Sequence, residues 1–236
     1  MAMQEHHLRT MYKVQTPSPL QFQYIHQHQR GFIIGGGPSL NTLDASDVTI
    51  LAKDEITFGV NKAYKLFTPT YLIFSDVYFW RHFEHEVNKV DCIKFVPDNV
   101  ARGHRGKKFV TVRRSSNPAD LLPSSLDLIS FINNSGVGAL RIAYAMGCNP
   151  IYLLGIDLGS NQAGETHFHH DYKRDPKRIT NPECYREFLT VFENTIKAMQ
   201  DKGVDIISCS SVYPLNKLIS YIPIKDVLKQ FSRLGD

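Results

Sequence analysis

Short apolar runs alternate with polar, helix-like stretches from Gly31 onward. Residues of β-branched and aromatic type fill the runs at 32–34, 56–60, 71–74, 93–96, 151–154 and 206–207. Continuous apolar runs of this length are typical of strands that are buried on both faces of a parallel sheet. Because helical patterns separate the runs, the sequence predicts a Rossmann-like, doubly wound α/β fold, with a mostly parallel sheet and helices on both faces.

Two stretches carry apolar residues at helical spacing. Residues 136–146 do so in a background of small side chains, and residues 182–199 form a longer amphipathic repeat. We expect both helices to pack on the sheet. Charges, prolines and serines interrupt the pattern at 98–134, which we interpret as an excursion or lid.

The chain has 236 residues, of which 42% are hydrophobic and 21% charged, as is ordinary for a globular domain. We divide it into a polar N-terminal arm at 1–29, a nucleotide-binding transferase domain at 30–222 and a C-terminal helix at 223–236. No apolar run approaches the roughly 20 residues that span a bilayer, and the polar start is not a signal peptide. We therefore expect a cytoplasmic protein with no membrane span.

The cysteines and the net charge limit which ligands and partners the sequence indicates. The four cysteines are dispersed and form no CxxC pair, so neither a zinc site nor a disulfide framework is indicated. The formal net charge is only +4, although basic residues cluster between 102 and 114. That cluster is either a solvated loop face or a surface that attracts phosphate, an anionic glycan or nucleic acid. Nucleic acid is not the partner we expect, and the oligomeric state stays open, a homo-oligomer included.

Three consecutive glycines, Gly35, Gly36 and Gly37, follow the first predicted strand. They let the backbone turn sharply and come close to a ligand, and Ser39 offers a hydroxyl where the amides of a helix start stabilise anions. We interpret the turn as a nucleotide-phosphate loop, the alternative being a tight βα turn. Leu40 stands where the Rossmann fingerprint needs a small residue, and no GKS or GKT follows, so neither standard motif is present.

Polar residues follow three other strands, and the carboxyl ends of parallel strands are where ligands bind in this fold class. Asn61 is expected to hold a ribose hydroxyl or a base edge. Asp76 and Asp157 are expected to grip ribose hydroxyls or to hold Mg²⁺ against a diphosphate. For all three residues, capping of a turn or helix is the alternative.

Ser135 and Gly136 begin the predicted helix at 136–146 and give a second helix start rich in free amides. The first such start is the glycine turn. Two starts that face one crevice suit a nucleotide phosphate, and this convergence is the central prediction from the sequence.

The segment GETHFHHDY concentrates His167, His169 and Asp171 in a polar loop. Imidazole titrates near neutrality and removes a proton from an acceptor hydroxyl, while Asp171 is placed to orient or charge it. The sequence does not choose between the two histidines. Metal ligation and an ordinary surface loop are the alternatives.

These motifs together resemble the family named for the archaeal 6-hydroxymethylpterin diphosphokinases, and more distantly the bacterial CMP-sialic-acid sialyltransferases. The similar segments are GGGPSLN at 35–41, GVNKAY at 59–64, YLIFSD at 71–76, SGVGALRIAYAMGCNPIYLLGIDL at 135–158 and HFHHDY at 167–172. They cover most of residues 31–222. The block at 135–158 is the most specific, because both groups share its order and spacing.

The resemblance implies a Rossmann-like domain that binds a nucleotide across Gly36, Gly37, Asn61, Ser135, Gly136 and Asp157 and transfers a group from it. In the sialyltransferases, tyrosines after the GID segment support the donor phosphate and a downstream histidine acts as base. Here Gly159 and Ser160 stand where a tyrosine is expected. The HFHHDY segment is closer to the diphosphokinase-related branch, many of whose members are thought to serve surface-glycan assembly.

The sequence thus predicts a nucleotide-dependent group transferase, acting on a small-molecule nucleotide donor and an acceptor. Glycosyl transfer from a nucleotide sugar such as a CMP-sugar is preferred. Mg²⁺-dependent diphosphoryl transfer from ATP is the second hypothesis, and a non-catalytic nucleotide- or glycan-binding module is the third.

Overall fold

The computed structural model describes residues 16–100, 108–117, 119–171, 182–210 and 214–232. The strands in these ranges form one eight-stranded sheet in the order β6-β5-β4-β3-β2-β1-β7-β8. Every neighbouring pair is parallel. The predicted α/β fold class is therefore confirmed, and the sheet is wholly parallel rather than mostly so.

Each apolar run of the sequence coincides with a strand, except that Phe74 of the run at 71–74 lies just past the end of its strand. These strands are β1 (Gly31–Ile34), β2 (Ile56–Val60), β3 (Tyr71–Ile73), β4 (Ile93–Pro97), β7 (Ile151–Leu154) and β8 (Ile206–Ser208). The central strands β1, β3 and β7 are buried along their whole length, as expected of a sheet with helices on both faces.

The prediction of an excursion or lid at 98–134 is wrong for much of that range. Residues of β5 (Phe109–Arg114) and β6 (Leu128–Ile129) add two strands to the sheet beyond β4. Val110 and Val112 point into the core, whereas Arg113 is exposed. Such alternation is typical of a strand near the edge of a sheet. The charged residues of the region interrupt the apolar run by which the other strands were predicted.

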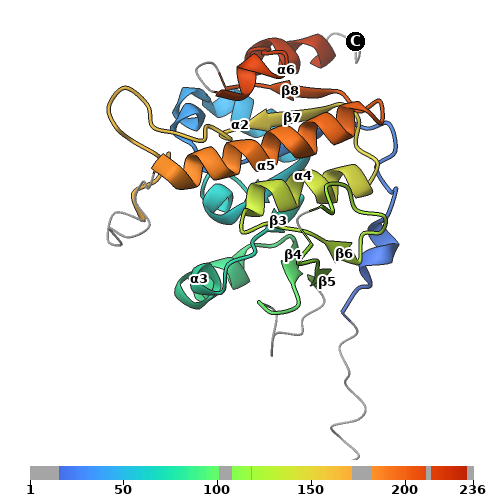
Figure 1. Cartoon of the computed structure of the whole chain (residues 1–236). Helices are drawn as coiled ribbons and strands as arrows, with labels where there is room; N and C mark the ends of the chain where they lie inside the picture. Colours follow the sequence, from blue (N-terminus) through green and yellow to red (C-terminus); the bar gives the residue numbers. More distant parts are fainter. Residues whose placement is uncertain (1–15, 101–107, 118, 172–181, 211–213, 233–236) are drawn as a thin grey trace, which may run out of the picture.

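Helices cover both faces of the sheet (Figure 1). The helices on one face are α4 (Ser135–Ala145) and α5 (Pro182–Gln200), which contact each other. Those on the other face are α2 (Ala45–Lys53), α3 (Val77–Lys89) and α6 (Ile224–Ser232). Short 3₁₀ turns are η1 (Pro19–Phe22), η2 (Pro38–Thr42), η3 (Asn61–Lys65) and η5 (Pro214–Lys217).

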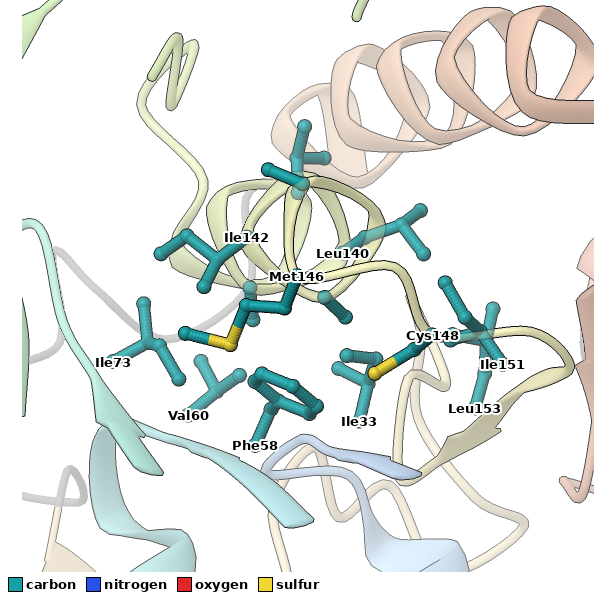
Figure 2. Packing of buried hydrophobic residues seen from close by; sticks show 14 of the residues in the cluster. Ile33, Phe58, Val60, Ile73, Leu140, Ile142, Met146, Cys148, Ile151 and Leu153 are labelled. Atoms are coloured by element: carbon teal, nitrogen blue, oxygen red, sulfur yellow. The ribbon is translucent and has the colours of Figure 1, made fainter. Parts of the chain in front are cut away.

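Helix α4 crosses the middle of the sheet and forms the centre of the main core. Figure 2 shows Leu140, Ile142 and Met146 of this segment packed over side chains of the central strands, among them Ile33, Phe58, Val60, Ile73 and Leu153. Small residues on α4 let the helix lie close to the strands. All its residues except Tyr144 are buried.

The path of the chain sets the position of the ligand site. It runs from β1 outward to β6, returns along α4, and enters β7 on the opposite side of β1. The connections after β1 and β7 therefore diverge to opposite faces of the sheet. A crevice at the carboxyl ends of two such strands is the usual binding site of a doubly wound fold.

The part of the predicted polar arm that the structure describes packs against the amino end of the sheet. Phe22 makes edge contacts with Tyr71 and Phe95, at ring-centroid distances of 6.3 and 5.4 Å. His26 Nε2 lies 2.8 Å from the Tyr71 hydroxyl. All four cysteines are free thiols. Among the described helices, none combines the length and apolar character that crossing a bilayer requires.

Candidate functional site

A cavity of about 230 Å³ lies at the carboxyl edge of the sheet, over β1, β2, β3 and β7. Most residues predicted for the site line it: Gly35, Gly36, Gly37, Asn61, Asp76, Ser135, Gly136, Asp157 and His167. The glycine turn and the start of α4 therefore face one space, as the sequence predicts. Ser39, His169 and Asp171 are not among the lining residues.

The glycine turn is shaped by its contacts with the segment after β7. The Gly35 amide donates to the Leu154 carbonyl and the Gly37 amide to the Gly155 carbonyl, each at 2.8 Å. A Cβ on Gly35 would lie 2.2 Å from the Gly155 carbonyl oxygen, and one on Gly37 would lie 2.2 Å from Asp157 Oδ2. These two glycines are thus required by the protein's own packing, whether or not a ligand is bound.

Asp157 fills the position where an anion was expected. The residue is 2% exposed, and its carboxylate accepts hydrogen bonds from the Ser39 amide at 2.7 Å and the Ser39 hydroxyl at 2.6 Å. Ser210 Oγ lies 3.2 Å from the same hydroxyl. The sequence assigned Ser39 to a phosphate and Asp157 to a nucleoside. In the structure these two residues bind each other instead, across 118 positions of the chain.

The start of α4 is closed by a neutral side chain. Asn134 Oδ1 accepts from the Gly136 amide at 2.8 Å and from the Val137 amide at 3.1 Å, which is an ordinary N-cap. The Ser135 hydroxyl lies 2.8 Å from the Ser75 hydroxyl and accepts from the Ser75 amide at 3.0 Å. These bonds join the start of α4 to the end of β3.

Two further predicted residues, Asn61 after β2 and Asp76 after β3, also line the cavity. Asn61 has a left-handed backbone, with φ of 50°, and its buried Oδ1 accepts no hydrogen bond from any described residue. An unpaired buried acceptor costs about 1–3 kcal/mol, so a ligand donor at this point would be stabilising. Asp76 caps α3 by accepting from the Tyr78 amide at 2.7 Å, which is the capping role given above as the alternative.

His167 is the histidine that reaches the cavity. Its Nδ1 lies 2.9 Å from Thr166 Oγ1, and the Phe168 amide donates to the Gly36 carbonyl at 3.0 Å, which holds the loop against the glycine turn. Burial lowers the pKa of His167. The ring is therefore neutral near pH 7 and has a nitrogen that can accept a proton.

His169 and Asp171 lie outside the lining of the cavity. Burial, reinforced by the positive charges nearby, lowers the pKa of His169 to about 4. Its Nδ1 is 3.9 Å from Asp171 Oδ2, too far for a hydrogen bond. The Asp171 carboxylate instead forms ion pairs with Lys65 at 2.5 Å and Lys62 at 3.3 Å. Tyr172, the last residue of the motif, lies outside the described residues.

One wall of the cavity is formed by residues of α5 that the sequence did not predict as site residues. Tyr185 and Phe188 of α5 line it beside Thr166. Burial raises the pKa of Tyr185, partly offset by a hydrogen bond with Thr166, so this phenol is protonated and can act as a donor. The amphipathic repeat of α5 predicts its core face, but not that its first turns extend past the sheet to the cavity.

Metal ligands are not grouped in the described part of the chain. No set of three or more His, Cys, Asp or Glu side chains in these ranges is close enough together to hold an ion. The basic cluster is also engaged where it is described: Arg113 pairs with Asp127 at 2.7 Å and Arg114 donates to Asn133 Oδ1 at 2.6 Å.

No protein-family model and no curated protein matches the chain. Several solved structures do. The MAf glycosyltransferase from Magnetospirillum magneticum AMB-1 aligns with a TM-score of 0.61 and 15% identity over 86% of this chain. The chain spans only 35% of that protein's length.

Two sialyltransferases align over most of their own length. The monofunctional alpha-2,3-sialyltransferase Cst-I from Campylobacter jejuni gives a TM-score of 0.54 and 15% identity, over 84% of this chain and 82% of its own. Sialyltransferase CST-II in complex with a trisaccharide acceptor and CMP gives 0.50 and 13%, over 83% and 86%. At these identities the likeness shows a shared fold.

Proposed function

We propose that the chain is a glycosyltransferase-like enzyme that binds a nucleotide sugar at the β1/β7 crevice and transfers the sugar to an acceptor glycan. The observation that carries the proposal is the cavity itself, which brings together the glycine turn, Asn61, the start of α4 and His167. The fold shared with glycosyltransferases supports this class of reaction, and CMP in a structural neighbour makes a cytidine nucleotide the first candidate.

The donor phosphate belongs at the start of α4. A helix N-terminus attracts negative charge, and at α4 the capping group is the neutral amide of Asn134. At the glycine turn the Asp157 carboxylate already takes the Ser39 donors and would repel a second anion. We therefore place the nucleoside toward Gly36 and Asn61, whose free Oδ1 suits a ribose hydroxyl or a base amino group.

His167 supplies the base. As the acceptor oxygen forms its bond to the sugar carbon, the bond from that carbon to the phosphate oxygen breaks, and the acceptor proton passes to the neutral imidazole. Thr166 fixes the ring through Nδ1. The cavity volume of about 230 Å³ is below the roughly 300–1,000 Å³ of most ligand pockets, so the transferred sugar would lie at its opening, where an acceptor can reach it.

Nucleotide binding and turnover test the proposal separately. Thermal shift with CMP, UDP, GDP, ADP and ATP, with and without Mg²⁺, identifies the base, and release of nucleotide from the matching nucleotide sugar measures turnover. His167→Gln should keep the thermal shift and lose about 100-fold or more of the turnover. His170→Gln, in the exposed part of the same loop, is the matched control. Absence of any nucleotide shift, or full turnover in His167→Gln, contradicts the proposal.

A further inference from the structure

A buried lysine follows the lining residue Asn61 and forms the centre of an ion-pair cluster, which we call the Lys62 cluster: Lys62, Lys65, Glu86 and Asp171. The Lys62 side chain is 0% exposed. Its Nζ is 3.0 Å from Glu86 Oε2, 3.3 Å from Asp171 Oδ2 and 3.2 Å from the centre of the Phe83 ring. A fully buried ammonium is rare, and this one has two carboxylates and an aromatic face around it.

The cluster joins three segments, and each of them reaches the cavity. Lys62 belongs to η3, which begins at the cavity with Asn61. Glu86 belongs to α3, which is capped at the cavity by Asp76. Asp171 belongs to the loop that brings His167 to the cavity. Lys62 in η3 therefore binds both of the other segments, α3 through Glu86 and the histidine loop through Asp171.

The surroundings of Lys62 keep these segments in one arrangement. If the Glu86 and Asp171 carboxylates, which are 45% and 28% exposed, moved away, the buried Lys62 ammonium would be left unpaired, which is far more costly than the loss of a surface pair. Burial disfavours ionisation of Asp171, but the bonds from Lys65 and Lys62 lower its pKa, so the carboxylate stays charged. Tyr64 also donates to Glu86, at 2.8 Å.

Lys65 offers an internal comparison. It pairs with the same Asp171 carboxylate at 2.5 Å, but its side chain is 35% exposed. A pair that is open to solvent contributes little, because water solvates both ions when it breaks. The two lysines thus share a partner and differ in burial.

We propose that Lys62 is a positioning residue of this site: its ion pairs hold the histidine loop and α3 against η3 and so fix His167 relative to Asn61. The consequence for turnover rests on the proposed function. The positional claim concerns only this chain's own residues and holds for the protein without ligand.

The experiment compares Lys62→Met with Lys65→Met and uses Lys62→Arg as the conservative rescue. The ring signals of His167 in the NMR spectrum of the ligand-free protein, followed through a pH titration, report its surroundings. We expect Lys62→Met to shift these signals and to raise the pKa of His167 toward its ordinary value, while Lys65→Met leaves both unchanged. Lys62→Arg should restore the wild-type signals.

Turnover gives the second readout. In Lys62→Met, kcat should fall roughly 10- to 100-fold, because small displacements of a catalytic group are costly, while the KM for the nucleotide sugar changes less than about threefold. If no nucleotide sugar is turned over by the wild type, the proposed function fails, and the His167 signals still decide the positional claim.

Two results would overturn the inference. One is a folded Lys62→Met protein with wild-type His167 signals, and the other is an equal effect of Lys65→Met. Should Lys62→Met not fold, Asp171→Asn keeps the shape of the loop while removing its charge, and unchanged His167 signals in that variant would overturn the inference as well.

Discussion

The glycine turn and the start of α4 both line the cavity and are similar in sequence, but their hydrogen-bond donors have different partners. Both follow the sheet's carboxyl edge and both begin a helical segment with small residues. At the glycine turn, the Asp157 carboxylate from the segment after the neighbouring strand β7 accepts from the Ser39 amide and hydroxyl, and the Phe168 amide of the histidine loop donates to the Gly36 carbonyl. At the start of α4, the neutral side chain of Asn134 accepts from the Gly136 and Val137 amides.

The difference shows that a glycine-rich turn after a strand is ambiguous. Its glycines can serve a ligand or serve the fold, and here Gly35 and Gly37 serve the fold because neighbouring atoms occupy the space of their missing side chains. The hydrogen-bond donors of Ser39 in this turn are taken by the Asp157 carboxylate of the protein itself. The anion-binding capacity of the start of α4 remains available to a ligand, since an amide cap is more easily displaced than a buried charge.

The largest effect is expected from Gly37→Ala. The new Cβ would lie 2.2 Å from Asp157 Oδ2, and either the turn or the carboxylate must move. We expect a loss of about 3 kcal/mol or more in the free energy of unfolding, measured by urea denaturation. In Gly159→Ala the nearest atom is 3.8 Å away, and this control should change stability by less than about 0.5 kcal/mol. Equal stabilities of the two variants would refute the packing role of Gly37.

Asp157→Ala tests whether the glycine turn is an anion site that the protein fills itself. Loss of the carboxylate leaves the Ser39 amide and hydroxyl without their acceptor and should cost about 2–3 kcal/mol. Inorganic phosphate should then raise the melting temperature of this variant more than that of the wild type. An identical response of the two proteins to phosphate would show that the turn has no anion-binding capacity.

The histidine loop that covers the glycine turn makes stability depend on pH. The pKa of His169 is about 4 in the folded protein and 6.5 ordinarily, so the unfolded chain binds more protons between these values. Stability should therefore fall as the pH drops from 6.5 toward 4, by about 2 kcal/mol at pH 5 from this group.

The difference in unfolding free energy between pH 7.5 and pH 5 measures this effect. His169→Gln should reduce the difference, whereas His170→Gln, whose side chain is exposed, should keep it. If His169→Gln shows the full wild-type dependence, the loop does not hold this ring buried and neutral.

The smallest effects are expected at the start of α4. Asn134→Ala should cost about 1 kcal/mol through the lost N-cap. Asn134→Asp should retain stability, because aspartate caps equally well, but it places a carboxylate where the account places the phosphate. Nucleotide affinity, measured by calorimetry, should fall about tenfold or more in Asn134→Asp. Unchanged affinity would mean that the phosphate lies elsewhere.

The sequence predicts the fold and the convergence of the two turns, because alternating apolar runs define parallel strands and polar residues follow their ends. It misses β5 and β6, where exposed charges such as Arg113 interrupt a half-buried strand. The bond between Asp157 and Ser39 depends on how two connections pack in space, and no local pattern contains that information.

The choice between His167 and His169 is missed for a similar reason. Residues two apart in an extended chain point the same way, which would place both histidines on one side. In the structure, the amide of Phe168, which lies between them, donates to the Gly36 carbonyl. Asp171 forms ion pairs with Lys62 and Lys65. The place of Tyr185 depends on how far α5 extends beyond the sheet, which its amphipathic period does not specify.

The central claim is that a nucleotide binds in this cavity with its phosphate at the start of α4. Titration of ¹⁵N-labelled protein with the nucleotide that gives the largest thermal shift tests it most directly. The account predicts that the amide signals of Ser135 and Gly136 shift and saturate, while that of Ser39, bonded to Asp157, stays in place. Saturating shifts at Ser39 with none at Ser135 and Gly136, or no shifts with any nucleotide, would contradict it.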